Sequence, residues 1–200
     1  PGSPIDRAWY AEELRQPFAD LAALQEAQRG GVLLPIPDDP ARNGFAPRGL
    51  APLDAANARW YAALRPEALG LLKRLAETYR REGGKAPLRV TGAASTVAYA
   101  RLEAAGSGRT AEPEPRTPSP EPSREPRTLS PDTAQPPPDP PVTSHMIGLG
   151  VDVARPVDPW DRKVLEYALS QIGDRMRAAW LRDASAGGYH LCPNPAFAGE

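Results

Sequence analysis

Several residue types that reveal compartment or chemistry are scarce in this chain. Its single cysteine, Cys192, cannot form a disulfide within the chain, so cysteine usage does not identify the redox compartment. Histidine occurs only twice, at His145 and His190, which limits any site that needs imidazole to these two positions. No apolar run is long enough to cross a membrane, and no signal peptide is recognisable. We therefore expect no membrane span in this chain.

An excess of charge of either sign is also missing. The 24 lysines and arginines nearly balance the 25 aspartates and glutamates, which gives a net charge of -1. Neither a basic surface for nucleic acid nor an acidic tail is expected from this balance. A chain of 200 residues is long enough for one globular domain with an added arm. Nucleic acid is therefore excluded as an expected partner.

Proline is the residue type present in excess, and it is concentrated in one segment. Of the 26 prolines, twelve lie between Glu112 and Pro141, a segment that contains repeated Glu-Pro, Ser-Pro and Thr-Pro pairs. This segment has almost no large apolar residue, so it cannot bury enough surface to offset its ordering entropy. We expect 112–141 to be a flexible insertion. Its possible roles are a spacer, a flap over a site, or a polyproline ligand for SH3-type or WW-type grooves.

The remaining sequence alternates between helical and strand-like patterns. Apolar spacing, capping residues and glycine stops predict helices over 6–28, 54–64, 66–82, 96–105 and 159–180. Strands are expected at 88–91, from His145 through 153, at 180–182 and at 189–192, with 32–52 irregular. This order predicts an α+β fold, with a small antiparallel sheet flanked by helices. Residues 1–65 would form a helical arm, and 66–200 the main domain.

Three residues of types that bind zinc occur where they can converge. His145 opens an expected strand, Asp152 follows seven positions later, and His190 lies in the closing strand. Gly148 lets the chain turn between the first two residues, and the small Gly150 leaves room beside them. The string from Ser144 to Asp152 resembles the Ser-x-His-x-x-Gly-x-Ala-x-Asp signature of zinc D-alanyl-D-alanine carboxypeptidases and dipeptidases, without the residue between Ser and His.

Two other segments extend this resemblance over roughly residues 66–195. The pair Tyr189-His190 resembles the aromatic-His pair that supplies the family's third zinc ligand, and Leu191–Pro195 resembles the ending of one branch of the family. Residues Leu88–Arg101 resemble the strand, turn and helix that precede the first metal motif. The resemblance implies the hedgehog/D-Ala-D-Ala metallopeptidase fold, in a divergent form.

The resemblance also implies a function. His145, Asp152 and His190 would bind Zn2+, and the substrate would be a peptidoglycan stem peptide cut near D-alanine. Ser144 and Ser95 would contact the substrate. An enzyme of this kind acts outside the cytoplasm, in the periplasm or cell envelope.

The chain departs from the family pattern at two catalytic positions. Where the family has an arginine after the first strand, the turn reads Ala93-Ala94-Ser95, so Arg89 or Arg101 would have to replace it. Gly187 stands where the family commonly has its glutamate base, three residues before the third ligand. Asp183 is the nearest carboxylate and becomes the candidate base, and Glu103 and Glu166 are the next carboxylates to test in that role.

Three hypotheses of function are consistent with these residues. The first is a zinc peptidase weakened by the missing arginine and glutamate. The second is a catalytically inactive zinc-binding module with a structural or cell-wall-binding role. The third places the function in partner binding by 112–141. Cys192, two residues after His190, is either a further metal ligand or a small buried apolar residue.

Overall fold

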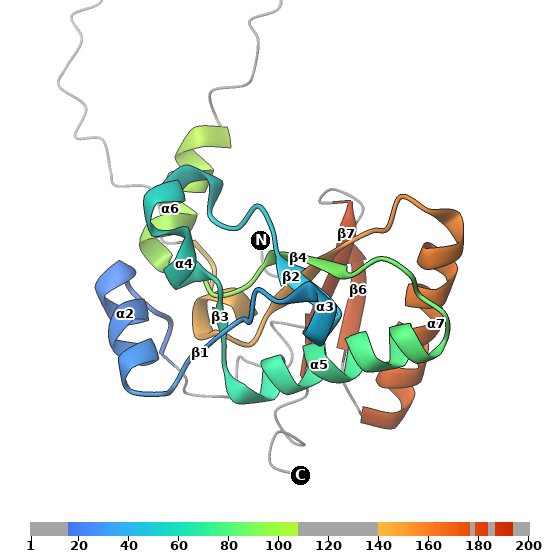
Figure 1. Cartoon of the computed structure of the whole chain (residues 1–200). Coiled ribbons are helices and arrows are strands. Elements are labelled where there is room, and N and C mark those ends of the chain that lie inside the picture. The colour runs from blue at the N-terminus through green and yellow to red at the C-terminus, as the bar shows by residue number, and fades with distance from the viewer. Residues whose placement is uncertain (1–15, 108–139, 177–178, 184–186, 194–200) are drawn as a thin grey trace, which may run out of the picture.

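A five-stranded sheet lies at the centre of the structure, which is a computed structural model describing residues 16–107, 140–176, 179–183 and 187–193 (Figure 1). The strand order is β2-β4-β5-β7-β6, and all neighbours are antiparallel except β2 and β4. The α+β class is therefore confirmed, with one parallel edge strand added to the antiparallel sheet. The strands are β2 (Phe45–Pro47), β4 (Leu88–Gly92), β5 (Val151–Ala154), β6 (Ala179–Asp183) and β7 (Gly188–Cys192).

Two long helices, α5 (Pro66–Arg81) and α7 (Pro159–Met176), cover one face of this sheet. Proline occupies the first turn of each helix, where its missing N–H costs nothing. The Asp158 carboxylate caps α7 by accepting the backbone N–H groups of Trp160 and Asp161 at 2.8 and 2.9 Å. The buried stripes of the two helices form the main core together with Val90, Val151, Val153 and Tyr189.

A second, smaller core packs beside the sheet and holds shorter elements together, at the left of Figure 1. Its buried residues include Leu24, Leu33, Tyr61 and Tyr99. The elements here are α2 (Leu21–Arg29), β1 (Leu34–Pro35), η1 (Pro52–Asn57), α4 (Ala58–Tyr61), β3 (Ala63–Leu64) and α6 (Val97–Ser107). The short helix α3 (Pro40–Asn43) lies apart from them, beside β2. Strands β1 and β3 pair with each other in a two-stranded sheet.

The sequence predicted α5, β4 and the β6–β7 hairpin close to their observed bounds, but four other segments differ. His145 lies in a 3-10 helix, η2 (Ser144–Ile147), and the strand begins only at Val151. The segment 32–52 contributes β1, α3 and β2, where an irregular connection was expected, and 54–64 is divided among η1, α4 and β3. Helix α7 ends at Met176, whereas the sequence predicted a helix reaching residue 180.

Two expectations fall wholly or partly on residues that the structure does not describe. The proline-rich insertion, 112–141, lies outside the described residues except for Pro140 and Pro141. Of the first expected helix, 6–28, residues 6–15 are likewise outside. Residues 16–20 are not helical, and the helix observed here, α2, begins only at Leu21, after the Asp20 cap.

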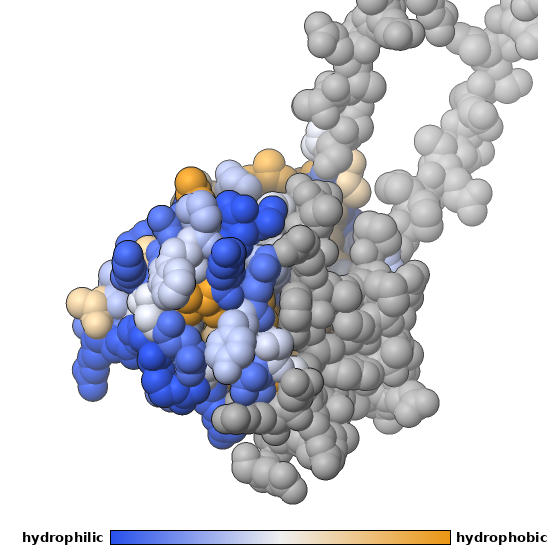
Figure 2. Space-filling model, turned by 90° about the vertical axis from the view of Figure 1, so that its right-hand side faces the viewer, coloured by the Kyte–Doolittle hydropathy of each residue, from blue (hydrophilic) through white to orange (hydrophobic). Residues whose placement is uncertain are grey.

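The surface on the side of α7 is mostly hydrophilic, as Figure 2 shows. This agrees with a helix that turns one apolar stripe toward the core and its remaining faces toward solvent. None of the helices that the structure describes is long and apolar enough to cross a membrane.

Candidate metal centre

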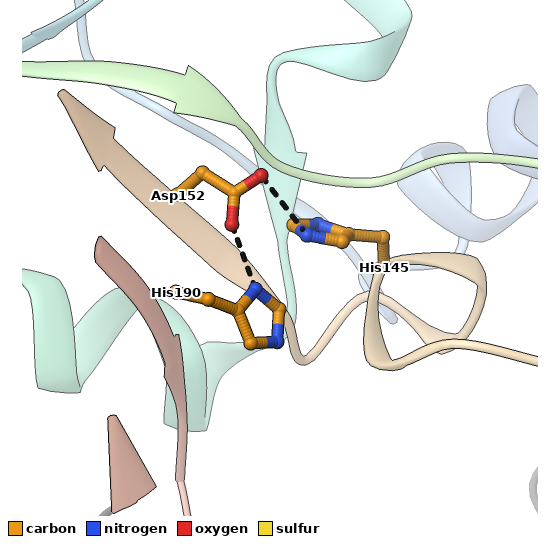
Figure 3. A group of neighbouring side chains, drawn as sticks. All are labelled: His145, Asp152 and His190. Carbon is orange, nitrogen blue, oxygen red and sulfur yellow. Dashed lines mark hydrogen bonds and ion pairs between the residues drawn. The ribbon is translucent and has the colours of Figure 1, made fainter. Parts of the chain in front are cut away.

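The side chains of His145, Asp152 and His190 converge on one point, as the sequence predicted (Figure 3). Asp152 lies between the two imidazoles: its Oδ2 is 3.2 Å from His145 Nε2, and its Oδ1 is 2.7 Å from His190 Nδ1. One ligand atom from each residue lies within 4.8 Å of the other two. Ligands of a tetrahedral zinc ion lie about 3.3 Å from one another, given bonds near 2.0–2.1 Å. This group can therefore hold a metal ion.

Strand register brings Asp152 and His190 together. The two residues pair directly across β5 and β7, so their side chains project from the same face of the sheet. Their neighbours Val151, Val153 and Tyr189 point to the opposite face and enter the main core. The alternation that buries the apolar residues thus also places the carboxylate and the imidazole next to each other.

His145 reaches the same point from η2, which precedes β5. Gly148 ends η2 with a φ of 78°, a left-handed conformation that glycine adopts without strain, and this redirects the chain into the strand. The turn after β4 holds His145 at two points. The Ala93 carbonyl oxygen lies 2.7 Å from His145 Nδ1, and the Ser95 N–H donates to the His145 carbonyl oxygen at 3.0 Å.

These contacts decide which nitrogen of each imidazole faces a metal. A carbonyl oxygen only accepts hydrogen bonds, so His145 Nδ1 carries the proton and Nε2 is left to face Asp152. His190 presents Nδ1 to Asp152, while its Nε2 lies 3.2 Å from both Ser144 Oγ and Cys192 Sγ. Metal-binding histidines usually donate their second N–H to a fixed partner in this way. The candidate ligand atoms are therefore His145 Nε2, His190 Nδ1 and an Asp152 oxygen.

Two glycines make the close packing around the ligands possible. A Cβ on Gly92, which pairs with Asp152 across β4 and β5, would overlap the Asp152 carboxylate and lie 2.9 Å from its Cβ. A Cβ on Gly150 would overlap Ser144 Oγ and lie 2.9 Å from the His145 backbone nitrogen. Both separations are shorter than ordinary contacts between non-bonded heavy atoms. Any larger residue at either position must therefore displace part of the ligand set.

The charges of the three side chains are coupled. Burial alone would raise the pKa of the Asp152 carboxyl, but His145 and His190 outweigh burial and hold that pKa well below its ordinary value. Burial likewise disfavours the charged form of His145, and the adjacent Asp152 carboxylate more than compensates and raises the pKa of His145. An ionised Asp152 between two imidazoles supplies the negative charge that a divalent cation requires.

A cavity of about 740 Å³ opens beside this group, with His145 and Asp152 in its wall. The turn after β4, the side of α6 and the chain just before η2 supply most of the remaining wall. This volume is in the range of cavities that take small molecules or short peptides. A ligand in the cavity would therefore touch two of the three candidate metal ligands.

The other residues singled out in the sequence occupy different positions. Ser95 lines the cavity, whereas the Ser144 side chain is fully buried beneath Gly150 and bonds His190. Arg101 is a cavity residue and Arg89 is not. The Asp183 backbone pairs with Gly188, two residues from His190, and the Asp183 side chain lies outside what the structure describes. Gly187 has a φ of 65° and lies just before β7.

Cys192 contacts His190 on the side away from the candidate metal position. Its Sγ lies near Nε2, whereas Asp152 is next to Nδ1, and the residue is 1% exposed. Of the two readings of Cys192, this geometry favours the small buried residue over the further metal ligand.

The contacts around His190 also place a serine, a histidine and an aspartate in the order of a hydrolase triad. Ser144 Oγ is 3.2 Å from Nε2, and Nδ1 is 2.7 Å from Asp152. A nucleophile must reach its substrate, however, and Ser144 is 0% exposed and is not part of the cavity wall. The arrangement therefore serves to orient His190 and does not present a nucleophile.

Glu103, one of the two further carboxylates that the sequence offered as a base, lies on α6 and lines the same cavity as His145 and Asp152. Its position depends on how α6 packs against the sheet, which local sequence does not reveal. Comparison of the chain with protein-family models, with curated proteins and with solved structures gives no match.

Proposed function

We propose that this chain is a zinc-dependent peptidase-like domain of the D-Ala-D-Ala carboxypeptidase class, which acts weakly on peptidoglycan stem peptides. The observation that carries the proposal is the convergence of His145, Asp152 and His190 at the wall of a cavity of about 740 Å³. These are the three residues that the motif resemblance names as zinc ligands. The same resemblance places the chain outside the cytoplasm.

The donor set fits zinc better than the harder divalent ions. Two imidazole nitrogens and one carboxylate leave a fourth tetrahedral position open, as in catalytic zinc sites, whereas Mg²⁺ and Ca²⁺ prefer oxygen ligands throughout. Bound zinc would lower the pKa of a coordinated water to about 7 and polarise a carbonyl group. The chain's own residues would orient the imidazoles through Ala93 and Ser144 and admit the peptide along the cavity.

Weak turnover follows from the residues around the donor set. Ala93 and Ala94 are buried and uncharged in the turn where the family has its arginine. Arg101 is the cation that lines the cavity among the described residues. A missing oxyanion donor typically costs about 10²–10³ in rate. The inactive zinc-binding module remains the alternative, and turnover separates the two readings.

Metal analysis of the purified chain tests the proposal. We expect about one zinc per chain, and loss of zinc in His145→Ala and Asp152→Ala. Asp38→Ala is the matched control, because Asp38 is an exposed carboxylate that pairs with Arg48. With zinc bound, hydrolysis of an N-acylated D-Ala-D-Ala peptide should be slow and abolished by chelation. Wild-type levels of zinc in Asp152→Ala would refute the metal centre. Zinc binding without any hydrolysis would favour the inactive module.

A further inference from the structure

Helix α6 carries a carboxylate into the cavity beside the candidate metal centre. The helix follows β4 through the turn whose Ala93 and Ser95 hold His145 (Figure 1). Residues on one side of α6 line the cavity. Apart from Asp152, Glu103 is the one carboxylate among the described residues that line this cavity. The position is therefore chemically distinct from the rest of the wall.

Tyr99 holds Glu103 in place. The two residues are one helical turn apart, and the Tyr99 hydroxyl hydrogen-bonds the Glu103 carboxyl. Tyr99 is itself fixed: its ring packs against Tyr61 with centroids 5.1 Å apart, and the Leu53 N–H lies 3.5 Å from its hydroxyl oxygen. The carboxyl group of Glu103 is thus positioned by a tyrosine that is part of the second core.

The surroundings of Glu103 suit proton transfer. Glu103 is exposed at the cavity, and its partial desolvation there raises the pKa of its carboxyl, although the nearby His145 and the Tyr99 hydrogen bond oppose this. Carboxyl groups with a raised pKa in a cleft are frequent general acids and bases. The other candidate glutamate, Glu166, lies on α7, and its Oε1 accepts a hydrogen bond from the Tyr189 hydroxyl at 2.8 Å on the core side of the sheet.

We propose that Glu103 is the proton-transfer residue of this site, in place of the glutamate that the chain lacks near His190. The proposal rests on the peptidase function proposed above. The Glu103 carboxylate takes one proton from a water molecule as the water oxygen bonds to the scissile carbonyl carbon. It returns that proton to the amide nitrogen as the C–N bond breaks, which releases a carboxylic acid and an amine. The carboxylate ends the cycle in its starting state.

A binding measurement tests this role without requiring turnover. Acetohydroxamic acid binds zinc as its anion, so its proton must pass to a nearby base or to the buffer. At about pH 6, below the pKa near 7 of a zinc-bound water, we expect Glu103 to retain this proton. Calorimetry of the zinc-loaded full chain, in two buffers with different ionisation enthalpies, counts the protons released. Wild type should release almost none, and Glu103→Gln should release about one per chain.

Matched variants separate Glu103 from its competitors. Glu77→Gln makes the same change on an exposed face of α5 away from the cavity, and it should behave as wild type. Tyr99→Phe should fall between wild type and Glu103→Gln in proton release, because the carboxyl is retained but loses its anchor. All three variants should keep the wild-type zinc content. In the hydrolysis assay, Glu103→Gln should lower kcat by about 10²-fold or more.

The outcomes distinguish this inference from the proposed function. Proton release in Glu103→Gln equal to that of wild type and Glu77→Gln would overturn the inference, whether or not peptides are cleaved. Proton release that appears in Asp183→Asn and not in Glu103→Gln would also overturn it and would assign the base to Asp183. A Glu103-dependent proton count without any hydrolysis would support Glu103 as the proton acceptor and refute the peptidase function. A chain that binds no zinc refutes both.

Discussion

Gly92 gives the sharpest test of the geometry, because its lack of a side chain is what makes room for Asp152. An alanine Cβ here would lie 2.7 Å from Asp152 Cγ and 2.9 Å from its Cβ, roughly 1 Å inside the usual contact distance of about 3.5–4.0 Å. Either the carboxylate or strand β4 must move by a similar amount. Metal–ligand distances tolerate only about 0.2 Å. Gly92→Ala should therefore displace a ligand without altering any ligand residue.

The expected loss is set by comparison with known metal sites. Changes to groups that only orient a ligand typically weaken metal binding by about 10- to 100-fold, and displacing the ligand itself should cost at least as much. The lower end corresponds to about 1.4 kcal/mol of binding free energy. Competition with a chromophoric chelator measures the zinc Kd directly. In addition, overpacking should lower the free energy of unfolding of the metal-free protein, measured with denaturant in EDTA, by about 1–3 kcal/mol.

The matched control is Gly70→Ala, the same substitution within helix α5. A Cβ on Gly70 would meet no atom within 4 Å, and alanine is favoured over glycine inside a helix by about 0.5–1 kcal/mol. Gly70→Ala should thus raise the free energy of unfolding and leave the zinc Kd unchanged. Wild-type zinc affinity in Gly92→Ala would refute the close approach of Asp152 to β4.

Two further predictions concern pH and the core. In the metal-free protein, the raised pKa of His145 contributes to the free energy of unfolding. This contribution is fully present below about pH 6.5 and is lost as the pH rises through the folded-state pKa. The lowered pKa of Asp152 makes a second contribution, which is lost in acid. Zinc affinity should instead rise over the neutral range, because zinc needs unprotonated imidazole. Between about pH 6 and 8, denaturant unfolding measures the fall of stability with pH, and chelator competition measures the rise of zinc affinity. Asp161→Ala should lower the free energy of unfolding by about 2–3 kcal/mol, since buried Asp161 accepts the Lys85 and Ala86 N–H groups at 2.9 and 3.3 Å. Its zinc Kd should equal that of wild type, which would separate damage to the fold from damage to the site.

The parts of the fold that local sequence determines were predictable, and the parts that tertiary pairing determines were not. Helix α5 could be predicted from its apolar spacing and the proline in its first turn. Strand β2 could not, because three residues within a proline-rich segment become a strand only by pairing with β4. His145 was placed in a strand because its neighbours alternate, whereas the turn at Gly148 separates η2 from β5.

The candidate site shows the same division. The convergence of the three candidate ligands could be predicted because a motif fixes their types and spacing, and the pairing of Asp152 with His190 follows once β5 and β7 are adjacent. The sequence offered Glu103 only as one of several further carboxylates, because its place in the cavity wall depends on the packing of Tyr99 against Tyr61. Residues that act through a motif are visible in sequence, whereas those that act through packing require the structure.

The energetics of the group favour metal binding as the reason for its arrangement. Asp152 is partly buried between two imidazoles, and removing charges from water usually costs about as much as their mutual attraction returns. Glycine at positions 92 and 150 also provides no side chain that could add packing contacts there. An arrangement that stabilised the fold alone would do as well with apolar residues at the three ligand positions. A divalent cation would change this balance, because it would contact all three side chains at once and compensate the carboxylate charge.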